Sequence, residues 1–318
     1  EKPNGLLVDY IYTSPHFNVE SIRRVLMKDI PTFQIHSIRL IESGWDNLVA
    51  EVNEEYIFRF PKDPGKSDYP GIKKQFTREV QVLNFLKGKI TLKIPEIEFV
   101  GRSVSYMGYR EIQGCSLTKD IIDSLGSAEK ETLYFDLAQF LMEFHTTLSV
   151  QKAKELGFED EDFDSYEKFI QKSLPSKIGD SGIVDFISKT CQEYTEMMKK
   201  NVEVVFLYND FHTENMVFDL VGKRLNGIID FGDTLIGDVH LDFSQLYKLD
   251  PYFMKRVAEQ YEKLTRRELN LRRIVIYGRI NELCDLAEFV NNPESTVYKN
   301  AVKRIKDWQL DMDIFKET

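Results

Sequence analysis

Cysteine is scarce in this chain: only Cys115, Cys191 and Cys284 occur among 318 residues. They are far apart and odd in number, so they suggest neither a disulfide framework nor a paired metal-binding motif. Such a pattern favours a reducing compartment, and a cytoplasmic location is expected. Long hydrophobic runs are also missing, because none approaches the roughly 18 residues that a membrane-spanning helix needs.

Positive charge is in deficit as well. Lysine and arginine number 42 against 52 aspartates and glutamates, which gives a formal net charge of -10. Nucleic acid and anionic membranes repel such a chain, so neither is expected as a partner. A cationic small ligand fits the balance better. Hydrophobic residues make up 42% of the chain, enough for a packed core, and the length suggests about two structural units of roughly 150 residues.

The first 112 residues mix strand and helix patterns. Short alternating apolar runs predict an antiparallel meander and two further strands, while apolar residues at helical spacing predict two helices. A stretch rich in proline and glycine predicts a loop. The helices are expected at 18–30 and 72–88, the loop at 61–71, and the strands at 35–41, 48–52, 56–60, 96–101 and 105–112.

Beyond residue 112 the pattern is mainly helical, with one β-rich island. Helices are expected at 128–147, 183–200, 241–249, 251–264, 267–289 and 296–311, and the island's strands at 202–208, 216–219 and 225–230. This organisation predicts an α+β fold with two lobes. A small antiparallel-sheet lobe would cover residues 1–110, and a larger, mainly helical lobe would cover 111–318.

The β-rich island carries the sharpest chemical signal. Asp210 and Asn215 lie five residues apart in a loop between strands, and Asp230 follows a hydrophobic strand and precedes Phe231-Gly232. Hard oxygen ligands of this kind suit Mg²⁺, which shares them with phosphate. Asn215 and Asp230 are therefore candidate magnesium ligands, and Asp210 could accept a proton from a hydroxyl nucleophile. The D-x-x-x-x-N and D-F-G pattern matches the protein-kinase superfamily.

The N-terminal lobe offers the other parts of a nucleotide site. Ser43 and Gly44 lie in a turn between strands, where backbone amides could approach phosphates. Arg59 and Lys62 lie three residues apart on an expected strand, and Glu79 lies on the helix expected after it. Glu79 could pair with either cation and hold it against the α- and β-phosphates. An exposed salt bridge of little energetic value is the alternative interpretation.

Over about residues 18–290 the sequence resembles the aminoglycoside phosphotransferases, most closely the 2″-phosphotransferases. The resemblance rests on N-D-F-H-T-E-N-M-V-F-D, G-I-I-D-F-G-D, Y-I-F-R-F-P-K, the linker Gly108–Gly114 and Ile276-Tyr-Gly278. It implies a protein-kinase-like fold with a nucleotide-binding N-terminal lobe and a catalytic, substrate-binding C-terminal lobe. It also implies that Asp210 is the catalytic base and that Asn215 and Asp230 hold Mg²⁺.

The resemblance further implies a nucleotide-binding hinge at residues 109–112, including Tyr109, Arg110 and Ile112. Tyr109 lies near the gatekeeper position, where a bulky aromatic is associated with a preference for GTP over ATP. Arg59 stands at the position of the family's phosphate-binding lysine, which leaves Lys62 as a candidate substitute. Tyr208 replaces a histidine that the family usually carries two residues before the base.

A cationic acceptor would need carboxylates of its own. Asp233 and Asp238 follow the metal loop, and Glu282, Asp285 and Glu288 recur every three residues on a late helix, so they share one side of it. Lining a cationic pocket and forming a solvated polar face are both open interpretations of this helix. Lys248 stands where the family segment usually presents an acid, which argues against an aminoglycoside.

The function expected from these observations is Mg²⁺-dependent transfer of the γ-phosphate of GTP or ATP to an aminoglycoside hydroxyl, at the 2″ position, conferring antibiotic resistance. One alternative keeps the chemistry and changes the acceptor to a macrolide, a choline-like compound, a sugar or an amino alcohol. The other alternative is a pseudokinase that binds nucleotide without catalysis.

Overall fold

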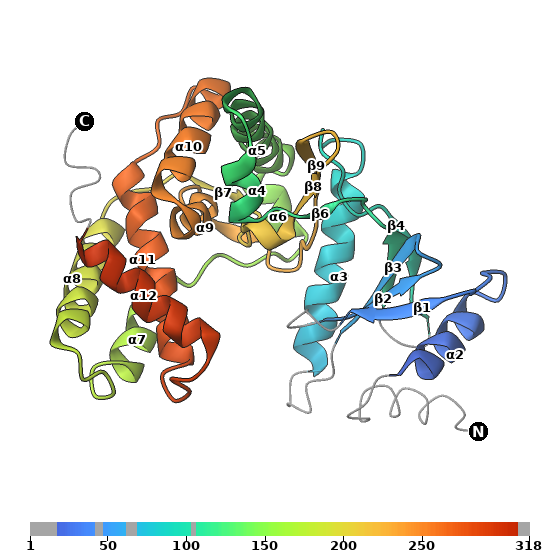
Figure 1. Cartoon of the computed structure of the whole chain (residues 1–318), viewed down its shortest axis with the longest axis horizontal. Coiled ribbons are helices and arrows are strands. Elements are labelled where there is room, and N and C mark those ends of the chain that lie inside the picture. Colours follow the sequence, from blue (N-terminus) through green and yellow to red (C-terminus); the bar gives the residue numbers. More distant parts are fainter. Residues whose placement is uncertain (1–17, 42–46, 62–68, 103–105, 311–318) are drawn as a thin grey trace. The chain divides into compact units, whose positions relative to one another are not determined.

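The computed structural model describes residues 18–41, 47–61, 69–102 and 106–310, and Figure 1 shows its elements. The chain divides into two compact units. One contains the described residues up to Cys115 together with 216–222 and 226–233; the other contains 116–215, 223–225 and the described residues from 234 onward. The sequence predicted a single division between residues 110 and 111, whereas these units share the chain in alternating segments.

An antiparallel sheet with the strand order β1-β2-β3-β5-β4 forms the centre of the first unit. Its strands are β1 Ile38–Ile41, β2 Asn47–Val52, β3 Tyr56–Pro61, β4 Ile97–Val100 and β5 Met107–Arg110. The β2–β3 hairpin turns at Asn53 and Glu54, whose φ angles of 59° and 56° are left-handed. The meander and the two further strands predicted from alternation are therefore confirmed.

Two helices cover opposite faces of this sheet, α2 Val19–Asp29 and α3 Tyr69–Leu86 (Figure 1). On β3, Phe58 and Phe60 point into the core that Ile22 and Leu26 of α2 complete. Arg59 lies between these phenylalanines in sequence and therefore points to the face that α3 covers. Burying a phenylalanine contributes about 1.5–3 kcal/mol, so this alternation determines which side of the strand carries charge.

The predicted loop over 61–71 is wrong at both ends. Strand β3 continues to Pro61, and α3 begins at Tyr69 rather than at residue 72. A proline is tolerated in the first turn of a helix, because the backbone N–H it lacks has no partner there. Pro70 is therefore compatible with helix, and Gly71 follows it within the same turn. At its other end the helix is followed by Gly88 with φ 71°, the stop that the sequence predicted.

Helices dominate the second unit, which also contains the antiparallel pair β7–β10. The helices are α4 Lys119–Ser124, α5 Ser127–Thr147, α6 Val150–Glu155, α7 Phe163–Ser173, α8 Ser181–Met198, α9 Leu241–Leu249, α10 Pro251–Thr265, α11 Leu271–Glu288 and α12 Thr296–Leu310. The paired strands are β7 Val204–Leu207 and β10 Leu235–Asp238. No helix in the described ranges is long and apolar enough to cross a bilayer.

Aromatic packing anchors the β7 strand and the loop after it to α5. Phe140 of α5 stacks on Phe211 with ring centroids 5.7 Å apart, and Phe144 stacks on Phe206 at 5.3 Å. All four rings are buried. Stacked pairs add about 0.5–1.5 kcal/mol to the burial of the rings. These contacts therefore fix the segment that contains Asp210 against α5.

The β-rich island forms as expected, and two strands that the sequence did not predict, β6 and β10, pair with its strands. A 3₁₀ turn at Thr213–Asn215 leads into the hairpin β8 Met216–Asp219 and β9 Arg224–Ile228, and β8 also pairs with the short strand β6 Cys115–Ser116. Strand β10 was missed because Leu-Ile-Gly-Asp is short and does not alternate.

Candidate active site

Arg59 is the centre of a buried ionic group in the first unit. Its Nη1 atom donates to Glu79 Oε1 at 2.5 Å, and its Nη2 atom donates to Asp230 Oδ1 at 2.9 Å. Arg59 and Glu79 are 4% and 2% exposed, whereas the Asp230 side chain is 43% exposed. Burial alone would lower the pKa of Arg59, but Glu79 and Asp230 outweigh it and raise the pKa. Of the two cations predicted as partners for Glu79, Arg59 makes the contact.

A strained backbone presents Asp230 to Arg59. Asp230 follows β9 and adopts φ 66°, a left-handed conformation that few residues other than glycine take. The next residue, Phe231, is buried and donates its backbone N–H to Glu79 Oε1 at 3.2 Å. One carboxylate on α3 thus binds both the cation and the D-F-G segment. Strain of this kind persists only where neighbouring contacts hold it.

Tyr109 belongs to the same group. It lies opposite Ile57 in the β3–β5 pairing, so its side chain shares a face with Arg59. The Tyr109 phenol interacts electrostatically with the Arg59 guanidinium. Tyr109 is 4% exposed, and burial raises its pKa to about 12. The sequence predicted Tyr109 near the nucleotide base but did not anticipate that it shares a face with Arg59.

The rest of the predicted hinge is open to solvent or partly so. Arg110 is exposed, pairs with Glu55, and lies over the Tyr56 ring at 4.8 Å. The Glu111 backbone N–H donates to Glu55 O at 2.8 Å. Ile112 is half-buried, and its backbone makes no hydrogen bond to the described residues. The backbone of Ile112 is therefore the part of the hinge best suited to contact a ligand.

In the second unit, Asp210 lies in the loop between β7 and the 3₁₀ turn, with a partner at each carboxylate oxygen. His212 Nε2 lies 3.2 Å from Oδ1, and Asn215 Nδ2 donates to Oδ2 at 2.7 Å. Burial would raise the pKa of Asp210, but the His212 and Asn215 contacts outweigh burial and hold it below its ordinary value. The carboxylate is therefore ionised at neutral pH and can accept a hydrogen bond from a hydroxyl.

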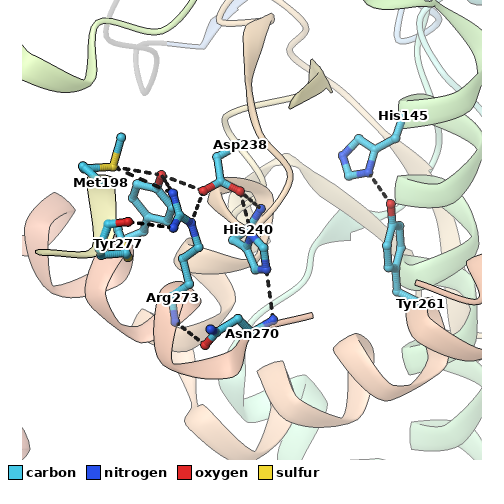
Figure 2. Close-up of polar contacts among 9 residues, drawn as sticks. His145, Met198, Asp238, His240, Tyr261, Asn270, Arg273 and Tyr277 are labelled. Atoms are coloured by element: carbon cyan, nitrogen blue, oxygen red, sulfur yellow. Dashed lines mark hydrogen bonds and ion pairs between the residues drawn. The ribbon is translucent and has the colours of Figure 1, made fainter. Parts of the chain in front are cut away.

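A second carboxylate supports the start of this loop. Asp242 of α9 accepts the backbone N–H groups of Tyr208 at 3.0 Å and Asn209 at 2.6 Å. It is also hydrogen-bonded to His145 of α5 at 2.8 Å. Figure 2 shows the other contact of His145, with Tyr261 of α10 at 2.9 Å. Asn209 has φ 68°, so these bonds hold an unusual backbone conformation.

The residues proposed as magnesium ligands have suitable chemistry. Asn215 uses its side-chain nitrogen on Asp210, so its side-chain oxygen remains available as a hard ligand. Asp230 is partly exposed and uses only Oδ1 on Arg59. In the described part of the chain, no three histidine, cysteine, aspartate or glutamate side chains could hold a metal by themselves. An amide, a carboxylate and phosphate oxygens are the combination that Mg²⁺ accepts in kinases.

Asp238, predicted to contact substrate, is fully buried at the end of β10 and is bound on both oxygens (Figure 2). Oδ1 contacts His240 Nδ1 at 2.6 Å, and Oδ2 contacts the Arg273 side chain and the Tyr277 hydroxyl. The Asn270 backbone N–H donates to His240 Nε2 at 3.0 Å, so the chain of bonds ends at the start of α11. These contacts tie β10 to α11 and leave the carboxylate no face for a ligand.

The three acids on α11 differ sharply in their surroundings. The Glu282 side chain is 1% exposed and pairs with both Lys248 and Arg304. Asp285 is partly exposed and lies 2.6 Å from Lys248 Nζ, while Glu288 is exposed. Asp233, in the loop before β10, is also exposed. The shared polar side that the three-residue spacing predicted is therefore partly neutralised by Lys248.

Three further predicted nucleotide-binding residues, Ser43, Gly44 and Lys62, lie outside the described residues. The structure groups Arg59, Glu79, Tyr109 and Asp230 in the first unit, and Asp210, His212 and Asn215 in the second.

Comparison with known proteins identifies the fold and the family. The model of the phosphotransferase enzyme family matches residues 37–279. The chain belongs to this family. It is therefore an enzyme of the kinase type, a phosphotransferase, and the predicted α+β, kinase-like fold with an antiparallel-sheet N-terminal part and a helical C-terminal part is confirmed.

Solved structures of such enzymes are similar along nearly the whole chain. The GDP complex of wild-type aminoglycoside 2′-phosphotransferase-IIIa is 20% identical, with a TM-score of 0.80, and the match covers 93% of this chain and all of that one. The gentamicin complex of APH(2″)-IIa is 22% identical, with a TM-score of 0.69, and covers 95% and 100%. Macrolide 2′-phosphotransferase type I is 12% identical, with a TM-score of 0.65, and covers 92% and 99%.

Proposed function

We propose that this phosphotransferase uses Mg²⁺ and GTP or ATP to phosphorylate an aminoglycoside at the 2″-hydroxyl, and so confers antibiotic resistance. The observation that carries the proposal is the ionised Asp210 carboxylate, held between His212 and the Asn215 amide at the end of β7. A carboxylate fixed in this way can orient an acceptor hydroxyl and take its proton. The complexes of similar enzymes with GDP, gentamicin and kanamycin support the proposed donor and acceptor.

In the proposed reaction the acceptor hydroxyl oxygen forms a bond to the γ-phosphorus, and the bond between that phosphorus and the β–γ bridging oxygen breaks. Asp210 takes the hydroxyl proton, and the nucleoside diphosphate leaves. Arg59, held by Glu79, would neutralise charge on the donor phosphates. The proposed nucleotide contacts also include the hinge residues Tyr109, Arg110 and Ile112, and the undescribed Ser43, Gly44 and Lys62.

Asn215 and Asp230 are the proposed ligands of Mg²⁺. The ion would supply positive charge that offsets the negative charge of the phosphate oxygens. Asp230 carries one oxygen that Arg59 does not use, and this oxygen is the proposed ligand. Asp230 is hydrogen-bonded to Arg59, and Asn215 is hydrogen-bonded to Asp210, so each side chain is oriented before the donor binds.

A second acceptor class is favoured by one observation. Lys248 lies 2.6 Å from Asp285 and 3.3 Å from Glu282, and Asp238 is bound internally. Asp238, Glu282 and Asp285, which were proposed to meet a cationic substrate together with Asp233 and Glu288, are therefore already bound by other side chains of the protein. A less cationic acceptor, such as a macrolide, a sugar or an amino alcohol, would suit this helix better than a polyamine.

The test is a phosphorylation assay with GTP and ATP against aminoglycosides, macrolides and simple amino alcohols, with the phosphate located in the product by NMR. Transfer to the 2″-hydroxyl of kanamycin or gentamicin supports the first acceptor class, and transfer only to the other compounds supports the second. Asp210→Ala is expected to lower turnover by about 10²-fold or more while nucleotide binding persists. Full activity of this variant would refute the role of Asp210.

Binding without transfer would indicate a pseudokinase. The decisive comparison is nucleotide-dependent thermal stabilisation with and without Mg²⁺, because a ligand of the folded state raises its stability by mass action. Stabilisation together with no transfer to any acceptor would overturn the catalytic proposal. The cytoplasmic location also stays a prediction.

A further inference from the structure

The guanidinium of Arg59 has more hydrogen-bonding capacity than its two carboxylate partners use. It carries five N–H donors in one plane, and the carboxylates of Glu79 and Asp230 each take one nitrogen. Arg59 is 4% exposed, so water cannot readily serve the remaining donors. A buried cation of this kind needs further protein acceptors.

The Tyr109 hydroxyl is an acceptor group of this kind, on a buried side chain that shares a face of the sheet with Arg59 and belongs to a third structural element. Glu79 lies on α3 and Asp230 follows β9, whereas Tyr109 lies on β5. The β3–β5 register places Tyr109 opposite Ile57, two residues from Arg59 on the same face. Diagonal neighbours at this spacing are within reach of a long side chain and an aromatic one. Strand register therefore places the Tyr109 side chain beside the buried Arg59 side chain, with which it interacts electrostatically.

We propose that Tyr109 is a positioning residue for phosphoryl transfer, whose hydroxyl fixes the Arg59 guanidinium in the orientation that binds the donor phosphates. This inference rests on the proposed function. It deepens that function by linking the residue beside the nucleotide base to the residue that binds the phosphates.

The physical reason lies in the shape of arginine. A lysine ammonium is a point charge whose three donors rotate freely, so two carboxylates suffice to hold it. A guanidinium is planar and useful only in one orientation, and two partners leave it able to swing about the line between them. A third partner on another strand removes that motion. The hydroxyl of Tyr109 should therefore matter with arginine at position 59 and not with lysine.

The experiment is a double-mutant cycle with four proteins: wild type, Tyr109→Phe, Arg59→Lys and the double variant. Calorimetry with Mg-GTP and Mg-ATP gives the dissociation constant, and steady-state kinetics give KM and kcat. When position 59 is arginine, Tyr109→Phe is expected to raise the nucleotide dissociation constant and KM about fivefold, the loss of one hydrogen bond. When Arg59→Lys is already present, the same change at Tyr109 is expected to have no effect.

Tyr106→Phe is the matched control. Tyr106 is also a buried tyrosine, three residues earlier, but its ring packs on Phe58 and Phe60 on the opposite face of the sheet. Removal of its hydroxyl should leave nucleotide affinity unchanged. Urea unfolding of all variants without nucleotide separates a loss of stability from a loss of binding, because a purely structural role would lower the former and leave KM unchanged.

Two failures are distinguishable. If the wild-type protein binds neither GTP nor ATP, both the proposed function and the positioning role are refuted. If the wild type binds nucleotide and Tyr109→Phe binds it equally well, only the positioning role is refuted. The same holds if Tyr109→Phe weakens binding equally in the wild-type and Arg59→Lys backgrounds.

Discussion

His145 and Asp242 form a 2.8 Å hydrogen bond, Nε2 to Oδ2, between two side chains with no exposed surface. The same Asp242 carboxylate accepts the backbone N–H groups of Tyr208 and Asn209. One buried acid therefore connects α5 and α9 with the segment that leads to Asp210. Because these contacts are far from solvent, they are worth more than surface bonds of the same length.

Asp242→Ala should be among the most destabilising single changes in the second unit. It leaves two backbone N–H groups and a buried imidazole without their acceptor, and the expected loss of unfolding free energy is about 3–5 kcal/mol. Urea unfolding measures it. Asp123→Ala is the control, because Asp123 is exposed and pairs with Lys119 on the surface, so a change within about 0.5 kcal/mol is expected. Equal effects of the two substitutions would contradict the supporting role of Asp242.

Acid should weaken the contribution of Asp238 to stability. Burial would raise the pKa of this carboxyl, but its contacts with His240 and Arg273 outweigh burial and hold the pKa below the ordinary value. A lowered pKa gives stability that is complete above the unfolded value of about 3.9 and is lost as the pH falls through the folded value. The difference in unfolding free energy between wild type and Asp238→Asn should therefore be constant from pH 7 to about pH 5 and shrink below about pH 4.

Urea unfolding at fixed pH values checks this expectation, with Asp123→Asn as the control that should show no comparable trend. A wild-type advantage over Asp238→Asn that stays constant down to about pH 3 would contradict it.

Lys248→Met should separate the two acceptor classes. The substitution removes the cation that lies 2.6 Å from Asp285 and 3.3 Å from the buried Glu282, while Arg304 remains on Glu282. We expect a loss of about 1.5–3 kcal/mol in unfolding free energy. If Asp285 meets a cationic acceptor, KM for kanamycin or gentamicin should fall about tenfold, a gain of one ionic contact. KM for an uncharged acceptor should change little.

Lys199→Met is the matched control, because Lys199 pairs with Glu196 and both side chains are more than half exposed. An unchanged aminoglycoside KM in the Lys248 variant would exclude Asp285 from the acceptor site.

Gly108→Ala should destabilise the sheet of the first unit. Gly108 lies opposite Phe58 in the β3–β5 pairing, and an added Cβ would be 2.5 Å from the Phe58 ring. Overpacking of this kind costs about 1–3 kcal/mol. Thermal or urea unfolding measures the loss, and Phe58→Leu in the same chain should recover part of it. Gly179→Ala is the control, since nothing lies within 4 Å of its added Cβ.

Sequence patterns predicted local structure well where apolar residues repeated at one spacing, either that of a strand or that of a helix. Alternation along β3 separated Phe58 and Phe60 from Arg59, and helical spacing placed Glu79 on α3, so the Arg59–Glu79 pair was one of two expected pairings. Asp210 and Asn215 lie five residues apart in one loop, as the sequence predicted, and the structure adds a hydrogen bond between their side chains. These features depend on residues close in sequence or on one strand register.

Other features depended on partners that no local pattern reveals. The spacing of Glu282 and Asp285 predicted a shared polar side, but Lys248 of α9 and Arg304 of α12 decide how much of that side is neutralised. Asp238 was predicted to contact substrate because it follows the metal loop, yet it ends β10 and is bound by His240, Arg273 and Tyr277. Lys248, Arg273, Tyr277 and Arg304 lie from 22 to 39 residues away from their carboxylates.

Each of the two units is built from separate segments of the chain, and this affects how the protein folds while it is being synthesised. Arg59 and Asp230 are separated by 171 residues, yet both belong to the first unit. As the chain leaves the ribosome, the sheet around Arg59 is made early, but the segment that completes its ionic group is made only after most of the second unit. Until that segment is made, Arg59 can pair with Glu79 but not with Asp230. Contacts this distant in sequence slow folding, so the nascent first unit should spend a long interval incomplete.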